Sequence, residues 1–244
     1  MTKFKISYNP FGEKALLVEW PPRIEQAILE DIIRFQKIIE KELSKEIIEC
    51  ILAYQSLTIV FNSEKTTYAD LLPKIKQFEN FKKNEIKLER RRWYLPICYD
   101  PEFGPDQELV ANLSGLPVHE IVHIHQSCSY TVYFIGFLPG FLYLGGLPEV
   151  IHTARKATPD PLIPKGAVAI GGSQTGIYPQ ESPGGWNVIG RTPVSLFDVN
   201  QNPPCFALPG DLLQFIPIDK HEYSILENQI KIGEFKIRMD LPDL

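Results

Sequence analysis

The side chains best suited to hold a ligand lie close together between residues 171 and 192. This stretch offers an amide, two aromatic rings with a polar edge and a guanidinium, carried by Gln174, Tyr178, Trp186 and Arg191. Amide, hydroxyl and indole groups form hydrogen bonds, and a planar guanidinium suits a carboxylate or a phosphate. The combination predicts a polar site for a small anionic ligand.

Glycine is concentrated around these side chains. Eleven of the sixteen glycines fall between Gly136 and Gly190. Because glycine loses more conformational freedom on folding than any other residue, such a density requires positive φ angles or a close approach to the backbone. We expect these loops to form a concave site with exposed amides. The expected ligand contacts are Gly171, Gly172, Gln174, Thr175, Tyr178, Gly184, Gly185, Trp186, Arg191 and Thr192.

Anion binding has two possible sources in this stretch. The run 170–173 matches neither GxxxxGK[ST] nor GxGxxG, but its successive amides are suited to cradle an anion. Arg191 leaves two interpretations open, since it either binds that anion or pairs with Asp198 or Asp211. Neither a nucleophile elbow nor a Ser/His/Asp order is visible, so no acid or base is assigned.

Three histidines, His119, His123 and His125, follow one another closely. On a strand, the last two would point to the same face, as in some metal sites. No carboxylate or cysteine set accompanies them at matching spacing, so we predict no metal site and prefer a hydrogen-bonding role. His125 is added to the candidate ligand contacts.

Composition excludes several classes of protein. The chain of 244 residues has a net charge of −5, which argues against a nucleic-acid-binding face. The N-terminus has no signal-like apolar run and no segment reaches membrane-spanning length, which predicts a cytoplasmic protein without membrane contact. The only methionines are Met1 and Met239, so there is no Met-Lys-Met biotin-attachment site. The four cysteines are expected to be buried thiols and not disulfides: Cys50, Cys98, Cys128 and Cys205.

The first part of the chain predicts an α+β domain. Helical spacing follows Pro21-Pro22 and recurs near residue 70, and shorter apolar runs alternate as strands do. The expected strands are Lys3–Tyr8, Ala15–Trp20, Ile47–Ala53, Leu57–Phe61 and Ile86–Tyr94, with a turn at Asn9–Gly12 and helices from Pro22 to about Leu43 and over Thr67–Phe81. We expect an antiparallel sheet with two helices on one face, and place domains at 1–90 and 91–244.

The second part predicts a mainly-β domain. A loop at Pro96–Pro105 and two short helices, from Asp106 to about Leu113 and over Pro117–His123, come first. Beyond them, short runs separated by Gly and Pro indicate a barrel or a sandwich. The expected strands are Tyr130–Phe137, Ala167–Ile170, Trp186–Gly190, Val194–Phe197, Leu212–Pro217 and Ile230–Ile237.

Several segments, in order over about residues 99–218, resemble the allophanate hydrolase subunit 1 family. This family includes the B subunit of bacterial ATP-dependent 5-oxoprolinase and the sporulation-kinase inhibitor KipI. The matching segments are Tyr99, Glu102–Asp106, His125, Tyr133–Phe141, Tyr143–Pro148, Gly171–Pro179, Ser182–Trp186, Gly190–Pro193, Leu196–Asp198 and Pro209–Asp211.

The resemblance implies a cyclophilin-like β-barrel in residues 91–244 and an enzyme subunit that is inactive alone. With an A-type (LamB/YcsF-like) and a C-type (allophanate hydrolase subunit 2-like) partner, such a subunit opens 5-oxo-L-proline to L-glutamate. The complex uses ATP, and whether ATP contacts this chain stays open. One alternative is a KipI-like inhibitor of histidine kinase autophosphorylation. Another is half of a carboxyltransferase of the urea carboxylase or allophanate hydrolase type.

The chain departs from the family pattern just before the glycine-rich stretch. Where the family often has Pro-Arg twice, this chain has Ala154-Arg155 and Pro159-Asp160. Asp160 reverses a charge. Either Lys165 replaces the lost cation, or this rim contacts something different.

Overall fold

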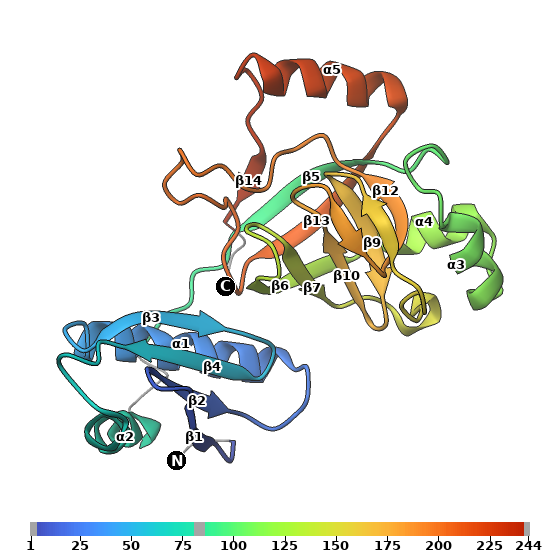
Figure 1. The fold of residues 1–244 in the computed structure, drawn as a ribbon. Helices are drawn as coiled ribbons and strands as arrows, with labels where there is room; N and C mark the ends of the chain where they lie inside the picture. The colour runs from blue at the N-terminus through green and yellow to red at the C-terminus, as the bar shows by residue number, and fades with distance from the viewer. Residues whose placement is uncertain (1–3, 81–85, 242–244) are drawn as a thin grey trace. The chain divides into compact units, whose positions relative to one another are not determined.

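The computed structural model describes residues 4–80 and 86–241, and the chain divides into two compact units, Met1–Glu89 and Arg90–Leu244 (Figure 1). The first unit contains β1 (Ser7–Phe11), β2 (Ala15–Glu19), α1 (Gln26–Glu42), β3 (Ile47–Leu52), β4 (Ser56–Phe61), α2 (Tyr68–Gln77) and η1 (Phe78–Asn80). The second contains β5 (Arg92–Cys98), α3 (Gln107–Ser114), α4 (Val118–Ser127), β6 (Ser129–Ile135), β7 (Leu142–Gly145), η3 (Glu149–Ile151), β8 (Asp160–Ile163), β9 (Ala167–Gly171), β10 (Gln174–Ile177), β11 (Ser182–Gly184), β12 (Asn187–Arg191), β13 (Leu212–Ile218), α5 (Lys220–Lys231) and β14 (Arg238–Asp240).

The first unit is an antiparallel sheet of order β1-β2-β4-β3 with α1 and α2 packed against it. Along β4 the side chains alternate, so that Leu57, Ile59 and Phe61 are buried and the residues between them are half-buried. On α1, Ile28, Ile32 and the other buried residues recur at helical spacing and cover the same face. The predicted antiparallel sheet with two helices is therefore confirmed.

The first predicted strand of this region ends too early. The first strand continues through Asn9, Pro10 and Phe11, where we expected a turn. Pro10 is tolerated because β1 is an edge strand, where a missing N–H breaks no ladder. The predicted start of this strand at Lys3 and the predicted end of the second helix at Phe81 lie outside the described residues.

The last predicted strand of the first domain belongs to the barrel. Instead of Ile86–Tyr94, the strand is β5, which runs through the expected loop as far as Cys98. It pairs in parallel with β13, about 120 residues later in the chain. Pro96 falls between the pairing of β5 with β14, which reaches Tyr94, and its pairing with β12 at Cys98. Among the described residues, no strand pairs with Pro96 on that side, so its missing N–H breaks no hydrogen bond there.

The second unit is a closed barrel of mixed strand direction (Figure 1). Its strands follow the order β12-β9-β10-β7-β6-β13-β5, and the pairing of β12 with β5 closes the ring, while β14 adds to β5 from outside. Closure removes the free edges that an open sheet would present. The seven-stranded ring confirms the predicted mainly-β barrel.

Both faces of the barrel wall are buried around β9. Val168 and Ile170 point into the barrel, among Leu95, Ile97 and Phe215. The alternate residues of the same strand pack on a second cluster outside the wall, which consists of Phe141, Ile163, Ala167, Ala169, Tyr178, Trp186 and Val188. We call this second group the outer aromatic cluster. Its existence explains why all five residues of β9 are buried.

The helices and the tail correct three further predictions. The histidine segment is part of α4, which extends to Ser127, so His123 is exposed and His125 is buried. Residues 194–197 form no strand beyond a single bridge of Phe197 with Cys205. The predicted strand Ile230–Ile237 is wrong: its first two residues belong to α5, which ends at Lys231, and the next strand, β14, begins only at Arg238. A capping box between Asp219 and Glu222 starts α5, a helix that we did not predict from the sequence.

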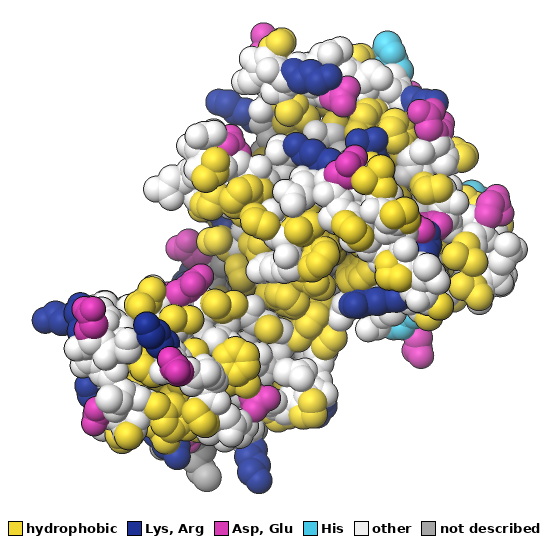
Figure 2. Space-filling view, in the orientation of Figure 1, with side chains coloured by type: hydrophobic (Ala, Val, Ile, Leu, Met, Phe, Trp, Pro, Cys, Tyr) yellow, Lys and Arg dark blue, Asp and Glu magenta, His cyan; other side chains and the backbone are white. Residues whose placement is uncertain are grey.

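Positive and negative side chains are interspersed over the face shown in Figure 2. Among the described residues, no helix combines the length and the apolar character required to cross a bilayer.

Candidate functional site

The glycine-rich strands lie directly beneath the indole ring of Trp186. A Cβ atom on Gly171 would come within 2.5–2.8 Å of three ring atoms, and one on Gly176 would lie 2.8 Å from the ring. On Gly184 a Cβ would clash with the hydroxyl of Tyr178. These glycines therefore serve the close approach of aromatic rings to the barrel wall.

The outer aromatic cluster continues across the wall as a series of ring contacts. Trp186 meets Phe141 and Tyr143 edge-on, with ring centroids 5.6 and 5.9 Å apart. Tyr143 stacks on Phe134 at 4.1 Å, and Phe141 meets Tyr178 at 5.0 Å. Burial raises the pKa of the Tyr178 hydroxyl to about 12 and also raises that of Tyr143. Both phenols are therefore neutral hydrogen-bonding groups near pH 7.

The guanidinium of Arg155 lies 5.2 Å from the centre of the Trp186 ring, within cation–π range. Its charge also acts on the hydroxyls of Tyr143 and Tyr178, whose pKa values it lowers against the larger effect of burial. The site thus combines one exposed cation with two phenols on a rigid aromatic base. We did not select Arg155 or Tyr143 from the sequence, although the Ala154-Arg155 departure marked the segment.

The predicted contacts divide between the two ends of β12. Gln174 is paired with Gly171 across the β9–β10 ladder, and so stands beside the Trp186 ring. Arg191 lies at the opposite end of β12, about 13 Å from Asn187 at 3.3 Å per residue. Its Nε donates to the carbonyl of Lys165 at 2.7 Å. The structure therefore does not bring Gln174 and Arg191 together.

The two acids considered as partners of Arg191 are engaged elsewhere. Asp211 pairs with Arg91 at 2.6 Å, and Asp198 accepts hydrogen bonds from Asn200. Thr192 is buried and accepts a hydrogen bond from the amide of Val194. Its own amide donates to the carbonyl of Gly166, which places Thr192 in the turn structure and away from the aromatic cluster.

The glycine turn between β9 and β10 is occupied by another segment of the chain. Gly172 and Thr153 exchange both backbone hydrogen bonds, at 2.7 and 3.2 Å. The amide of Gly172 is therefore not available to an anion, contrary to the anion cradle that we expected at 170–173. Gly185 also pairs with this segment, because its carbonyl accepts a hydrogen bond from the amide of Lys156 at 2.7 Å.

His125 and Thr175 meet inside the barrel and not at its surface. Thr175 donates to the carbonyl of Ala169 at 3.0 Å, which leaves its oxygen to accept from Nε2 of His125, 3.0 Å away. Nδ1 of His125 then accepts from the hydroxyl of Tyr99 at 2.8 Å. Each donor has one acceptor, so the ring is held neutral, and burial lowers its pKa to about 3. This chain of hydrogen bonds is an internal brace.

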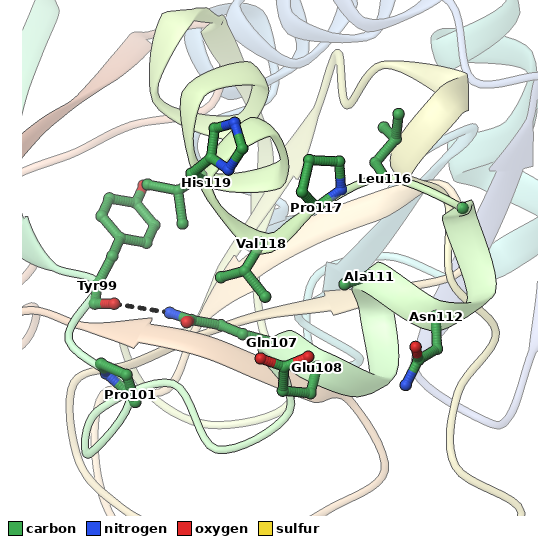
Figure 3. Close-up of a pocket in the computed structure, with 12 residues that line it drawn as sticks. Tyr99, Pro101, Gln107, Glu108, Ala111, Asn112, Leu116, Pro117, Val118 and His119 are labelled. Carbon is green, nitrogen blue, oxygen red and sulfur yellow. Dashed lines mark hydrogen bonds between the residues drawn. The ribbon is translucent and has the colours of Figure 1, made fainter.

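A hollow of about 870 Å³ lies between α3 and α4 (Figure 3), and its lining contains none of the contacts predicted between residues 171 and 192. Gln107 braces its floor by donating from Nε2 to the carbonyls of Tyr99 and Ile189. The charged residue in the lining is Glu108. An acidic side chain disfavours an anionic ligand, so the hollow fits the predicted ligand less well than the Arg155 surface.

Neighbouring glycines provide a test of the packing under Trp186. We expect Gly171→Ala to destabilise the barrel by about 1–3 kcal/mol, the usual range for overpacking, and to shift Trp186 fluorescence. Gly172→Ala adds a methyl group into open space at a φ of +69°, so it should cost only about 1 kcal/mol and leave the emission unchanged. Chemical denaturation followed by fluorescence compares the two. Equal stabilities with identical emission would contradict the packing.

The family model "Carboxyltransferase domain, subdomain C and D" matches residues 6–207. The chain belongs to this carboxyltransferase subdomain C and D family. A curated relative, the B subunit of 5-oxoprolinase from Bacillus subtilis, is 36% identical over 229 residues, which cover 89% of this chain and 95% of the relative. The resemblance to the family of 5-oxoprolinase B subunits, predicted from sequence motifs, is thereby confirmed.

Solved structures show the same carboxyltransferase-like architecture. TTHA0988 superposes with a TM-score of 0.73 at 28% identity, over 84% of this chain and 40% of that one, so this chain spans less than half of TTHA0988. The urea amidolyase of Kluyveromyces lactis superposes with a TM-score of 0.80 over 96% of this chain and 16% of that protein. At 20% identity the second likeness concerns the fold alone.

Proposed function

We propose that this chain is the B subunit of an ATP-dependent 5-oxoprolinase that opens 5-oxo-L-proline to L-glutamate together with an A-type and a C-type subunit. The observation that carries the proposal is the 36% identity to the B subunit of a 5-oxoprolinase, over 95% of that relative's length. The alignment covers 95% of the relative and 89% of this chain, so the match is not confined to one short module.

The chemistry requires an activated amide. Transfer of the γ-phosphoryl group of ATP to the amide oxygen makes the ring carbon electrophilic. Water then adds to this carbon, the C–N bond breaks to release the amine, and a second water releases phosphate from the resulting acyl phosphate. Cations and hydrogen-bond donors that face the developing charge stabilise such steps. We assign this chain a binding surface for the reaction and propose that its partners complete the centre.

The proposal extends to the architecture and the compartment. We propose that residues 1–90 and 91–244 are separate domains, that the barrel is cyclophilin-like, and that the complex works in the cytoplasm, where ATP is supplied. The inhibitor of histidine kinase autophosphorylation and the urea carboxylase-type carboxyltransferase remain predictions from the sequence.

Reconstitution tests the function directly. The purified chain, an A-type subunit and a C-type subunit are mixed with ATP and 5-oxoproline, and glutamate is measured. We expect glutamate with all three subunits and ATP, and a loss of at least about 100-fold when this chain is left out, as for other centres that lack an essential positioning part. No glutamate from three folded subunits would reject the proposal.

A further inference from the structure

The segment that carries Arg155 is attached to the barrel on both sides. Thr153 pairs with Gly172, and the carbonyl of Ala154 accepts from Nδ2 of Asn187 at 2.9 Å. On the other side, the amide of Lys156 donates to Gly185. The backbone around Arg155 is therefore held in place before any ligand arrives, which reduces the entropy cost of binding.

Lys156 forms ion pairs with the two carboxylates near this segment, Asp106 and Asp160. Its Nζ lies 2.7 Å from Asp106 and 2.6 Å from Asp160. The second oxygen of Asp106 accepts from the amide of Val188 at 2.7 Å, which fixes that carboxylate to β12. Asp160, the reversed charge of the family pattern, is thus neutralised by Lys156, and not by Lys165, whose Nζ approaches the hydroxyl of Ser195.

Arg155 is consequently an uncompensated cation. Within residues 4–80 and 86–241, no ion pair includes it, although two carboxylates are bound by the next residue in the chain. Its guanidinium lies over Trp186 and is exposed to solvent. In a chain with a net charge of −5, a fixed and exposed cation on an aromatic surface favours an anionic ligand.

A polar group without a partner, Gln174, is paired in the strand register with Gly171, which lies beneath the same ring. Gln174 is half-buried beside Trp186, and its side-chain oxygen is buried with no hydrogen-bond partner in the described structure. A buried acceptor left unpaired is destabilising, and an incoming N–H group would satisfy it after a small rotation of this side chain. The half-buried ring of Tyr143 lies 5.9 Å from the Trp186 ring between centroids and supplies an apolar face near Arg155, whose charge acts on its hydroxyl.

We propose that Arg155 binds the carboxylate of a small cyclic amide acid, and that Lys156 is a positioning residue that keeps Asp106 and Asp160 from neutralising it. The assignment rests on the proposed function, whose substrate carries one carboxylate, one ring N–H and apolar ring carbons. Arg155 meets the carboxylate, Gln174 the ring N–H and Tyr143 the ring carbons.

The first test separates the carboxylate from the rest of the substrate. In the reconstituted enzyme, Arg155→Met should raise KM for 5-oxoproline about 10- to 100-fold, the value of a charge-assisted hydrogen bond, with a smaller change in kcat. Turnover of 2-pyrrolidinone, the same ring without a carboxylate, should not change. Arg238→Met is the matched control, because Arg238 also lies over an aromatic ring, at 4.2 Å from Tyr94, but pairs with Asp240. An unchanged ratio of kcat/KM for the two substrates in Arg155→Met overturns the inference.

The second test addresses Lys156. Lys156→Met should free Asp160 to pair with Arg155 and raise KM for 5-oxoproline several-fold, while Lys156→Met/Asp160→Asn should recover most of the loss. A purely structural role of Lys156 predicts no recovery, because the double variant lacks the same ion pair. Equal KM values for the single and the double variant would therefore remove Lys156 from the proposal.

A binding test keeps this inference separate from the enzyme assignment. Tryptophan fluorescence, to which Trp186 contributes together with Trp20 and Trp93, is titrated with 5-oxoproline and with its uncharged carboxamide, for the isolated chain and for its complex with the C-type subunit. We expect saturable binding of 5-oxoproline but not of the carboxamide, and we expect Arg155→Met to lose this binding. Binding without turnover would reject the proposed function and keep the site, whereas turnover with acid and carboxamide bound equally would reject the site and keep the function.

Discussion

Replacing Asp211 with alanine is expected to destabilise the barrel by about 3–5 kcal/mol, the cost of breaking a buried charge pair from one side. Asp211 is 3% exposed and connects two strands that are far apart in the sequence. Its oxygens accept from Arg91 at 2.6 Å, from the indole of Trp93 at 2.9 Å and from the amide of Leu208 at 2.9 Å. Alanine would leave these donors without their acceptor, and the indole of Trp93 among them is buried.

The measurement is urea denaturation followed by the fluorescence of Trp93 and Trp186, both of which report on the barrel. Asp211→Asn is the matched control, since it keeps the side-chain volume and one acceptor oxygen. Its free energy of unfolding should fall roughly half as much as that of Asp211→Ala, because the hydrogen bonds lose only the contribution of the charge. Arg91 is partly exposed, so Arg91→Met should cost less than Asp211→Ala. A loss below about 1 kcal/mol for Asp211→Ala would show that the network is not a main support of the barrel.

Acidification should weaken the barrel through His125. The pKa of His125 is lowered by burial from 6.5 to about 3 in the folded protein, while the unfolded chain keeps the ordinary value. Between these limits the unfolded state binds a proton that the folded state does not. The contribution of His125 is therefore complete above pH 6.5 and falls as the pH drops, by about 1.4 kcal/mol per unit.

The comparison with His125→Gln isolates this effect from that of the carboxylates. A glutamine amide can donate to Thr175 and accept from Tyr99 without titrating. Denaturation midpoints measured from about pH 7.5 to about pH 4.5 should converge or cross as the pH falls, because only the wild type carries the histidine penalty. Parallel pH profiles for the two proteins would contradict the buried neutral imidazole.

Local patterns were sufficient for much of the architecture. The spacing of apolar residues in α1 and the alternation in β4 predicted both elements, since each of them buries one regular face. Ordered motifs between residues 99 and 218 predicted the family, which the comparisons confirm. Helix α5 was missed, and the segment Ile230–Ile237, which contains the end of this helix, was misinterpreted as a strand.

The sequence by itself determined the family and the mainly-β character of the second unit. Tertiary structure decided which side chains share the candidate site. Pairing of β5 with β13 joins segments about 120 residues apart, and the position of Arg155 over Trp186 depends on bridges to Gly172 and Asn187 from another part of the barrel. Such contacts arise from ring closure and from competition among charges, in which Lys156 takes the acids and leaves Arg155 free of an ion pair within the described residues. The spacing of residues along the chain predicts neither the ring closure nor the choice of ion pairs, because both depend on distances in space.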